Sequence, residues 1–166
     1  MLKTFSIIAN AATLIGMVAF GAYNIKDASA QEIVDHTSPD EKYCLQQNIY
    51  FEARDQSELG KRAVAWVTLN RVDDSRYPDT ICEVVWQKKQ FSWTHDGKSD
   101  VPSDNVIEQR AWKRAGEVTE SVLFKYYSGS NKLVGDAVMF HADYVAPYWM
   151  DHYEEVVTID NHIFYQ

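Results

Sequence analysis

The stretch that decides the fold is SPDEKYCLQQNIYFEAR, residues 38–54. It begins with a capping hydroxyl, continues with a proline at the first helical position and carries the capping-box glutamate Glu41, so we expect a helix to begin here. Leu45, Ile49 and Glu52 recur at spacings of four and three, which places them on one face of a helix expected to end near residue 54 or 55. A carboxylate therefore continues the apolar stripe.

An inward carboxylate at position 52 has two readings. Desolvation would raise the pKa of Glu52 toward the range in which a carboxylic acid can donate a proton at neutral pH. The alternative is a structural glutamate paired with a buried arginine, and Arg54 or Arg71 could serve. Position alone does not choose between them.

The remainder of the chain predicts an α+β fold in which helices dominate. Residues 90–97 are expected to be extended and to lead into an Asp-Gly turn. The inward face of the last helix is expected to start at Ile107. Capping and periodicity place helices at about 57–71, 80–87 and 105–127, and β-leaning segments at 137–144, 156–159 and 162–165.

Composition bounds the class of protein. The chain has 166 residues, of which 46% are apolar, enough for a single domain with one core. Sixteen Lys and Arg against 24 Asp and Glu give a net charge of −8, so nucleic acid is not expected as a partner. The aromatic content of 13% suits a large core and equally suits a groove for sugar-like ligands.

The first thirty residues have the features of a secretory signal. Lys3 precedes a mostly apolar run over residues 5–23, and Ala28-Ser29-Ala30 presents a cleavage site of small residues. The run is nearly long enough to cross a bilayer, so an uncleaved anchor is the alternative, and only then would a membrane be a partner. Both readings predict export to the periplasm, the cell wall or the medium.

Export changes the expectation for the two cysteines. Outside the cytoplasm a single pair is more often joined than free, which predicts a disulfide between Cys44 and Cys82. Two buried thiols are the alternative.

A series of motifs occurs in a fixed order: NIYFEAR at 48–54, LNRV at 69–72, YPDT at 77–80, QFSW with DG at 90–97, HADY at 141–144 and NHIFY at 161–165. Together they resemble the SleB/CwlJ-type cell wall hydrolase family over about residues 43–166. The resemblance implies a lysozyme-like single domain that degrades peptidoglycan, after a signal or anchor at 1–30 and a lead-in at 31–42. It also implies that Glu52, the glutamate of the E-A-R motif, is the catalytic acid.

Spore members of this family act as lytic transglycosylases, which implies cleavage between N-acetylmuramic acid and N-acetylglucosamine. A glycoside hydrolase usually needs a second carboxylate, whereas a transglycosylase can use one, because the C6 hydroxyl of the muramic acid is the attacking group. Glu58, Asp96 and Asp143 are candidate second carboxylates, so hydrolysis stays open.

The motifs also supply candidate groups for binding the glycan, with core packing as the alternative for the aromatic ones. The predicted substrate-binding residues are Tyr50, Asn70, Gln90, Phe91, Ser92, Trp93, Tyr144 and His162.

Two other functions compete. A zinc-dependent N-acetylmuramoyl-L-alanine amidase could draw on His141, Asp143, His152 or His162, but no tight H-E-x-x-H pattern is present, and we expect neither a metal nor another cofactor. A noncatalytic wall-binding protein is the second competitor, against which the retained Glu52 argues. A monomer that acts on peptidoglycan strands is expected.

Overall fold

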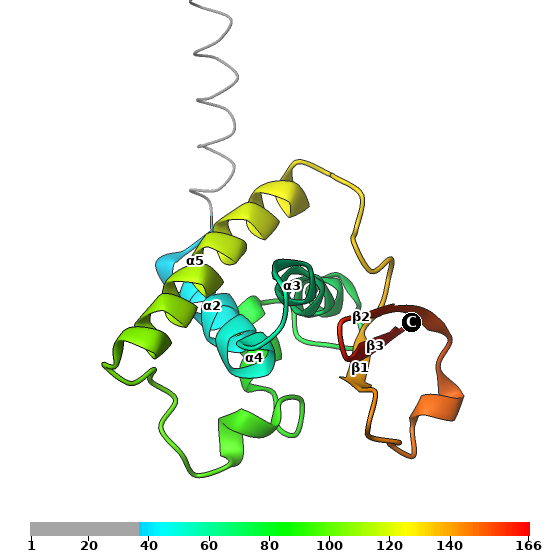
Figure 1. Cartoon of the computed structure of the whole chain (residues 1–166). Coiled ribbons are helices and arrows are strands. Elements are labelled where there is room, and N and C mark those ends of the chain that lie inside the picture. Colours follow the sequence, from blue (N-terminus) through cyan, green and yellow to red (C-terminus); the bar gives the residue numbers. More distant parts are fainter. Residues whose placement is uncertain (1–36) are drawn as a thin grey trace, which may run out of the picture.

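The computed structural model describes residues 37–166, so the predicted signal or anchor at 1–30 lies outside the described residues. The chain forms a helical body followed by a small sheet (Figure 1). Its elements are α2 (Pro39–Ala53), α3 (Glu58–Asp73), α4 (Ile81–Trp86), the 3₁₀ helix η1 (Ser92–His95), α5 (Val106–Tyr127), β1 (Met139–Ala142), the 3₁₀ helix η2 (Met150–His152), β2 (Glu155–Ile159) and β3 (His162–Tyr165). The predicted α+β class with dominant helices is confirmed.

Helix α2 begins where its sequence predicts. Glu41, the glutamate expected to complete the capping box of α2, binds another helix instead. The Ser38 hydroxyl accepts from the backbone N–H of Glu41 at 3.2 Å. The Glu41 carboxylate accepts from the N–H groups of Ile81, at 2.6 Å, and of Cys82, at 3.3 Å. These N–H groups at the start of α4 have no acceptor within the helix, and a carboxylate is favourable there. Glu41 therefore joins α2 to α4.

A disulfide joins the same two helices. Cys44 on α2 and Cys82 on α4 are bonded, with their Cα atoms 5.2 Å apart, so the predicted pairing is confirmed. The cross-link and the Glu41 contacts hold α4 against the half of α2 that precedes Glu52.

The hydrophobic core lies where α2 packs on α3, α4 and α5. Leu45 and Ile49 are fully buried there, as their spacing predicts, whereas Ile107 is 75% exposed and its predicted inward orientation is wrong. The apolar contacts of α5 with the core begin at Ala111 and Trp112, because the first turn of this helix meets the end of α2 through Glu108 and leaves Ile107 facing away.

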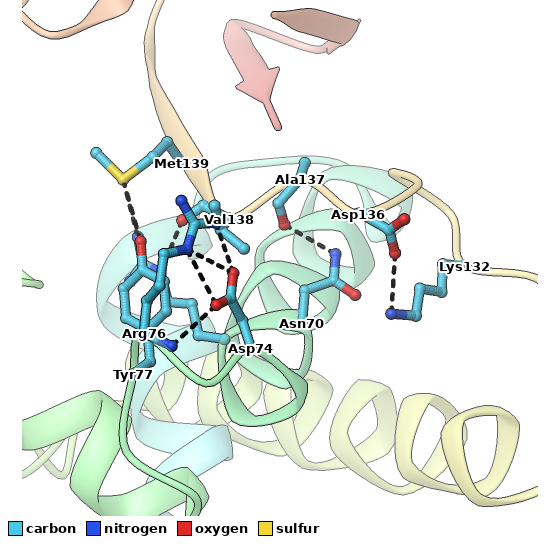
Figure 2. Close-up of polar contacts among 10 residues, drawn as sticks. Asn70, Asp74, Arg76, Tyr77, Lys132, Asp136, Ala137, Val138 and Met139 are labelled. Atoms are coloured by element: carbon cyan, nitrogen blue, oxygen red, sulfur yellow. Dashed lines mark hydrogen bonds and ion pairs between the residues drawn. The ribbon is translucent and has the colours of Figure 1, made fainter. Parts of the chain in front are cut away.

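The sheet is antiparallel, in the order β1-β3-β2, and it is joined to the C-terminal end of α3. The Asn70 side-chain amide donates to the backbone carbonyls of Gly135, at 2.9 Å, and Ala137, at 2.8 Å, in the segment that leads into β1 (Figure 2). Arg71 donates through Nε to the carbonyl of Val138 at 2.7 Å. Neighbouring residues of the L-N-R-V motif therefore hold the sheet on the helical body.

Residues 92–95 form a 3₁₀ turn, so the predicted extended conformation of 90–97 is wrong. The hydroxyl and the N–H of Thr94 both donate to the carbonyl of Phe91, at 2.9 and 3.4 Å, and this closes the turn. The turn still buries Phe91 and Trp93 and leaves Ser92 exposed. The alternation of buried and exposed side chains, which is typical of a strand, is produced here by a 3₁₀ turn.

None of the helices within residues 37–166 combines the length and the apolar content needed to cross a bilayer.

Candidate active site

Glu52 occupies the last turn of α2 and is half-buried. Burial raises the pKa of its carboxyl to about 7, and the positive charge of Arg71 acts in the opposite direction. Within residues 37–166 the carboxylate takes part in no hydrogen bond and no ion pair. It is therefore a partly desolvated acid whose oxygens are free of protein partners.

Arg71 is held in place by groups other than Glu52. The residue is 3% exposed, its Nε donates to Val138, and its Nη2 lies 3.8 Å from the Met139 sulfur. The guanidinium carbon lies 5.0 Å from the ring centroid of Phe91 and 5.4 Å from that of Tyr77. Stacking between two aromatic rings suits the flat guanidinium, which retains its charge when buried. Its Nη1 is buried and has no hydrogen-bond partner among the described residues.

Arg54, the other arginine considered for Glu52, is paired elsewhere. Its Nη1 lies 2.9 Å from Glu108 Oε2 on α5, and the Tyr50 hydroxyl donates to the same oxygen. This cluster fastens the end of α2 to α5 and leaves Glu52 on a different face. The structural ion pair considered for Glu52 is not formed with Arg54.

Two of the three candidate second carboxylates have partners of their own. Glu58 pairs with Arg62 at 2.6 Å, and Asp96 accepts from the backbone N–H of Lys98 at 2.8 Å. The third, Asp143, is exposed.

Five of the eight predicted substrate-binding residues are buried: Tyr50, Asn70, Phe91, Trp93 and His162. Asn70 and Phe91 have contacts within the fold. The Asn70 side-chain NH₂ donates to two backbone carbonyls, its Oδ1 is buried without a hydrogen-bond partner among the described residues, and Arg71 lies over the Phe91 ring. The sequence offered both as candidate ligand groups, with core packing as the alternative for Phe91, because contacts between α3 and the segment 135–138 are not visible in a local pattern.

The rings of Tyr50 and Trp93 are packed in the fold, but both residues also line a hollow at the surface. The indole N–H of Trp93 donates to Asn48 at 3.2 Å, and its ring stacks on Phe51 with centroids 4.6 Å apart. The exposed Ser92 borders the same space, and Glu52 is not among the residues that surround it. The hollow has a volume of about 380 Å³ and is lined by Tyr50, Phe51, Arg54, Ser92, Trp93, Asp96, Lys98, Ser99 and Asp100.

Phe51 is a residue of this hollow that sequence reasoning missed. Its position next to Glu52 in the helix was the available indication, but stacking on Trp93 requires the tertiary fold.

The remaining predicted residues lie apart from one another. Tyr144 is 81% exposed on the segment between β1 and η2, and Gln90 is half-buried ahead of η1. His162 is packed against Phe140 and Phe164, with centroid distances of 5.3 and 6.3 Å, and its Nδ1 is buried without a hydrogen-bond partner among the described residues. The fold therefore does not bring all the predicted groups together in a single polar groove.

The histidines considered for zinc do not converge. His141 Nε2 lies 2.9 Å from the Tyr165 hydroxyl, and His152 is exposed on η2. Among residues 37–166, no three His, Cys, Asp or Glu side chains gather in a metal-binding arrangement.

Comparison with known proteins connects this geometry to one family. Residues 55–165 match the model of the family described as Cell Wall Hydrolase, a range that begins just after Glu52. The spore cortex-lytic enzyme of Halalkalibacterium halodurans is 25% identical over 120 residues, which cover 72% of this chain and 33% of that protein. The spore cortex-lytic enzyme of Oceanobacillus iheyensis is 24% identical over 116 residues, which cover 70% and 38%. This chain therefore spans about a third of the length of these relatives.

The fold has a counterpart among solved structures. The catalytic domain of the germination-specific lytic transglycosylase SleB from Bacillus anthracis aligns with a TM-score of 0.59 at 24% identity, covering 79% of this chain and 98% of that domain. The fold expected from the motifs is thereby confirmed. Because the family model matches well over half of the residues, this chain belongs to the cell wall hydrolase family, of the SleB/CwlJ type that its motifs resemble.

Proposed function

We propose that this protein is an exported peptidoglycan glycosidase that cleaves the bond between N-acetylmuramic acid and N-acetylglucosamine as a lytic transglycosylase. Glu52 acts first as the acid and then as the base. Family membership and the names of the relatives support the substrate class.

The state of the Glu52 carboxyl carries the proposal. With a pKa of about 7, a large fraction of the molecules hold the proton at neutral pH, where an ordinary glutamate would have lost it. Neither oxygen is engaged by a described residue, so the acid is free to approach a leaving oxygen. A structural glutamate of the same burial would be expected to have a partner.

The proposed reaction needs one carboxyl group. Glu52 donates its proton to the glycosidic oxygen as the bond from that oxygen to C1 of the muramic acid breaks, and positive charge develops at C1. The C6 hydroxyl of the same sugar then bonds to C1 and gives its proton to the Glu52 carboxylate. The products are a chain with a free hydroxyl and a 1,6-anhydro-muramyl end, and Glu52 is protonated again.

The environment of Glu52 supports transglycosylation over hydrolysis. A hydrolase of this type uses a second carboxylate within roughly 5 to 10 Å to hold a water or to form a covalent intermediate. Glu58 and Asp96 already have cationic or backbone partners of their own, and no second carboxylate is hydrogen-bonded to Glu52 among the described residues.

Arg71 has an electrostatic part in this scheme. Its charge stabilises the carboxylate form of Glu52, which exists between the two proton transfers. Without that charge, burial alone would hold the proton more tightly and would slow its donation.

Binding of the glycan is proposed for the groups that the fold leaves accessible. Ser92 and the edges of Tyr50 and Trp93 border the hollow beside the end of α2, and Tyr144 presents an open ring. Gln90, which precedes η1, and the buried His162 do not line this hollow, and we propose that they support the site from outside it.

Export is part of the proposal. The disulfide between Cys44 and Cys82 is a bond that persists outside the cytoplasm, and a peptidoglycan substrate lies there as well.

The decisive experiment is mass spectrometry of purified sacculi after digestion. Products with 1,6-anhydro-muramyl ends support the proposal, reducing ends indicate hydrolysis, and freed stem peptides indicate an amidase. Glu52→Gln should release no product, whereas Glu154→Gln, a matched change of an exposed carboxylate, should act as the parent does. A parallel digestion with a chelator tests the amidase, since a zinc enzyme loses its activity and regains it with zinc. Pelleting with sacculi but no product from the parent protein would indicate a wall-binding protein.

A further inference from the structure

A second hollow, of about 430 Å³, lies between the first turns of α3 and the middle of α5. Lys61 of α3 and Arg114 of α5 bring two positive charges to it. The chain as a whole has a net charge of −8, whereas the lining of this hollow has three basic residues against two acidic ones, Glu58 and Glu117. The hollow is lined by Gln56, Ser57, Glu58, Lys61, Arg62, Arg114, Glu117 and Val118.

Lys61 is a buried cation that forms no ion pair within residues 37–166. The residue is 6% exposed, and its ammonium donates to the backbone carbonyl of Gln56. Burial lowers its pKa, and the charge of Arg114 lowers it further. The charges of Asp55, Asp160 and Glu58 act in the opposite direction. An ammonium has three donors, so Lys61 retains capacity for an anion.

The other charged residues of the hollow are already paired. Arg62 binds Glu58 at 2.6 Å, and Glu117 lies 3.6 Å from Lys113. Arg114 has no hydrogen bond or ion pair within residues 37–166. Lys61 and Arg114 therefore form the unneutralised part of the site, and together they match an anionic group with two oxygens.

The hollow is continuous with the surface near the proposed catalytic helix. A neighbouring hollow is lined by Arg54 and Arg114, so it shares Arg114 with this site. It also shares Arg54 with the hollow of Tyr50 and Trp93. The three hollows follow the face of α2 that carries Arg54, so a branch of the ligand that lies on this face can extend toward Lys61.

We propose that Lys61 and Arg114 bind a carboxylate of the acidic peptide stem carried by the glycan strand. This inference rests on the proposed function, because the ligand is a part of that substrate. A peptide stem branches from the lactyl group of muramic acid, so it leaves the sugar chain sideways. The hollow gives such a branch a separate anionic anchor, which would select strands that keep their peptides.

The test is calorimetric titration of the full chain carrying Glu52→Gln, which prevents turnover. The ligands are a disaccharide peptide with free carboxylates, the same compound with its carboxylates amidated, and the disaccharide without peptide. Arg114→Gln and Lys61→Met should each weaken binding of the acidic ligand about tenfold, the effect of losing one charge-assisted hydrogen bond. Binding of the amidated ligand should not change. Lys88→Gln, which removes an exposed cation outside this hollow, should bind all three ligands as its parent does.

Equal affinity for the acidic and amidated ligands would overturn the inference, as would unchanged affinity in Arg114→Gln. Competition by inorganic phosphate as strong as that of the acidic peptide would also overturn it, because the site would then be selective for charge alone. Arg114 is exposed, so its variant tests the site even if Lys61→Met fails to fold. Failure of the proposed function is seen separately, when protein with Glu52 intact releases no sugar product from sacculi.

Discussion

Arg71 is the charged neighbour that stabilises the carboxylate of Glu52, yet the two side chains form no ion pair among the described residues. The guanidinium is held instead by the carbonyl of Val138 and by the rings of Phe91 and Tyr77. Because the guanidinium does not pair with Glu52, its positive charge offsets only part of the increase in pKa that burial causes. The pKa of Glu52 is left at about 7, a value suited to donating and accepting one proton.

The pH dependence of cleavage should report the Glu52 acid. Since the reaction begins with protonated Glu52, kcat/KM should fall above about pH 7. Well above this pH, each further unit of pH should lower kcat/KM about tenfold, which gives the alkaline limb of the pH profile. Initial rates on a soluble glycan strand between pH 5 and 9 measure this. A rate that keeps rising through pH 9 would exclude Glu52 as the acid.

Replacement of Arg71 should shift the fall of kcat/KM, the alkaline limb of the pH profile, to higher pH. Removing its charge leaves burial unopposed and raises the pKa of Glu52, so Arg71→Gln should stay active at higher pH but react more slowly. Arg71→Lys should restore most of the original profile. Arg54→Gln is the matched control, because Arg54 pairs with Glu108 and should not affect the limb.

Glu52→Gln should make the fold more stable while it abolishes cleavage. A carboxyl whose pKa rises from 4.5 to about 7 on folding loses stability as the pH rises between these values. The cost is complete above pH 7 and amounts to about 3 kcal/mol. Urea unfolding should therefore show a gain of that order for the variant at pH 8 and little difference at pH 4. An equal gain at both pH values would mean that the carboxyl is not desolvated.

Loss of the disulfide should destabilise the helical body. Cys44 and Cys82 are separated by 38 positions, and opening a loop of this size costs roughly 4 kcal/mol in the chain-entropy model. The double variant Cys44→Ala with Cys82→Ala should unfold at a lower temperature by calorimetry. At low temperature it should still cleave glycan, because Glu41 continues to hold α4 on α2. The parent treated with a reductant should match the double variant.

Asn70 should prove to be a structural residue. Asn70→Ala removes two hydrogen bonds to the carbonyls of Gly135 and Ala137, so it should cost about 2 to 3 kcal/mol of stability. KM for glycan should change less than twofold at a temperature where the variant is folded. A large rise in KM with unchanged stability would restore the substrate-binding role.

The sequence by itself determined where the helices begin. It also determined that Glu52 lies on the same helix face as Leu45 and Ile49. Ser38 and Ser57 cap α2 and α3 as expected, because capping depends on residues within one turn. The spacing of Leu45, Ile49 and Glu52 placed the carboxylate on the buried stripe, because helical periodicity is also a local property. The predicted disulfide followed from export and from the count of cysteines.

Only the tertiary structure decided how the polar side chains are used. Asn70 binds the segment before β1, Glu41 caps α4, and Arg54 turns to Glu108 on α5. Each partner lies at least 40 positions away along the chain, so no local pattern distinguishes these groups from ligand-binding ones. The physical reason is that a buried polar group must find a partner wherever the fold supplies one. Glu52, which finds none among the described residues, stands out only once the partners of its neighbours are known.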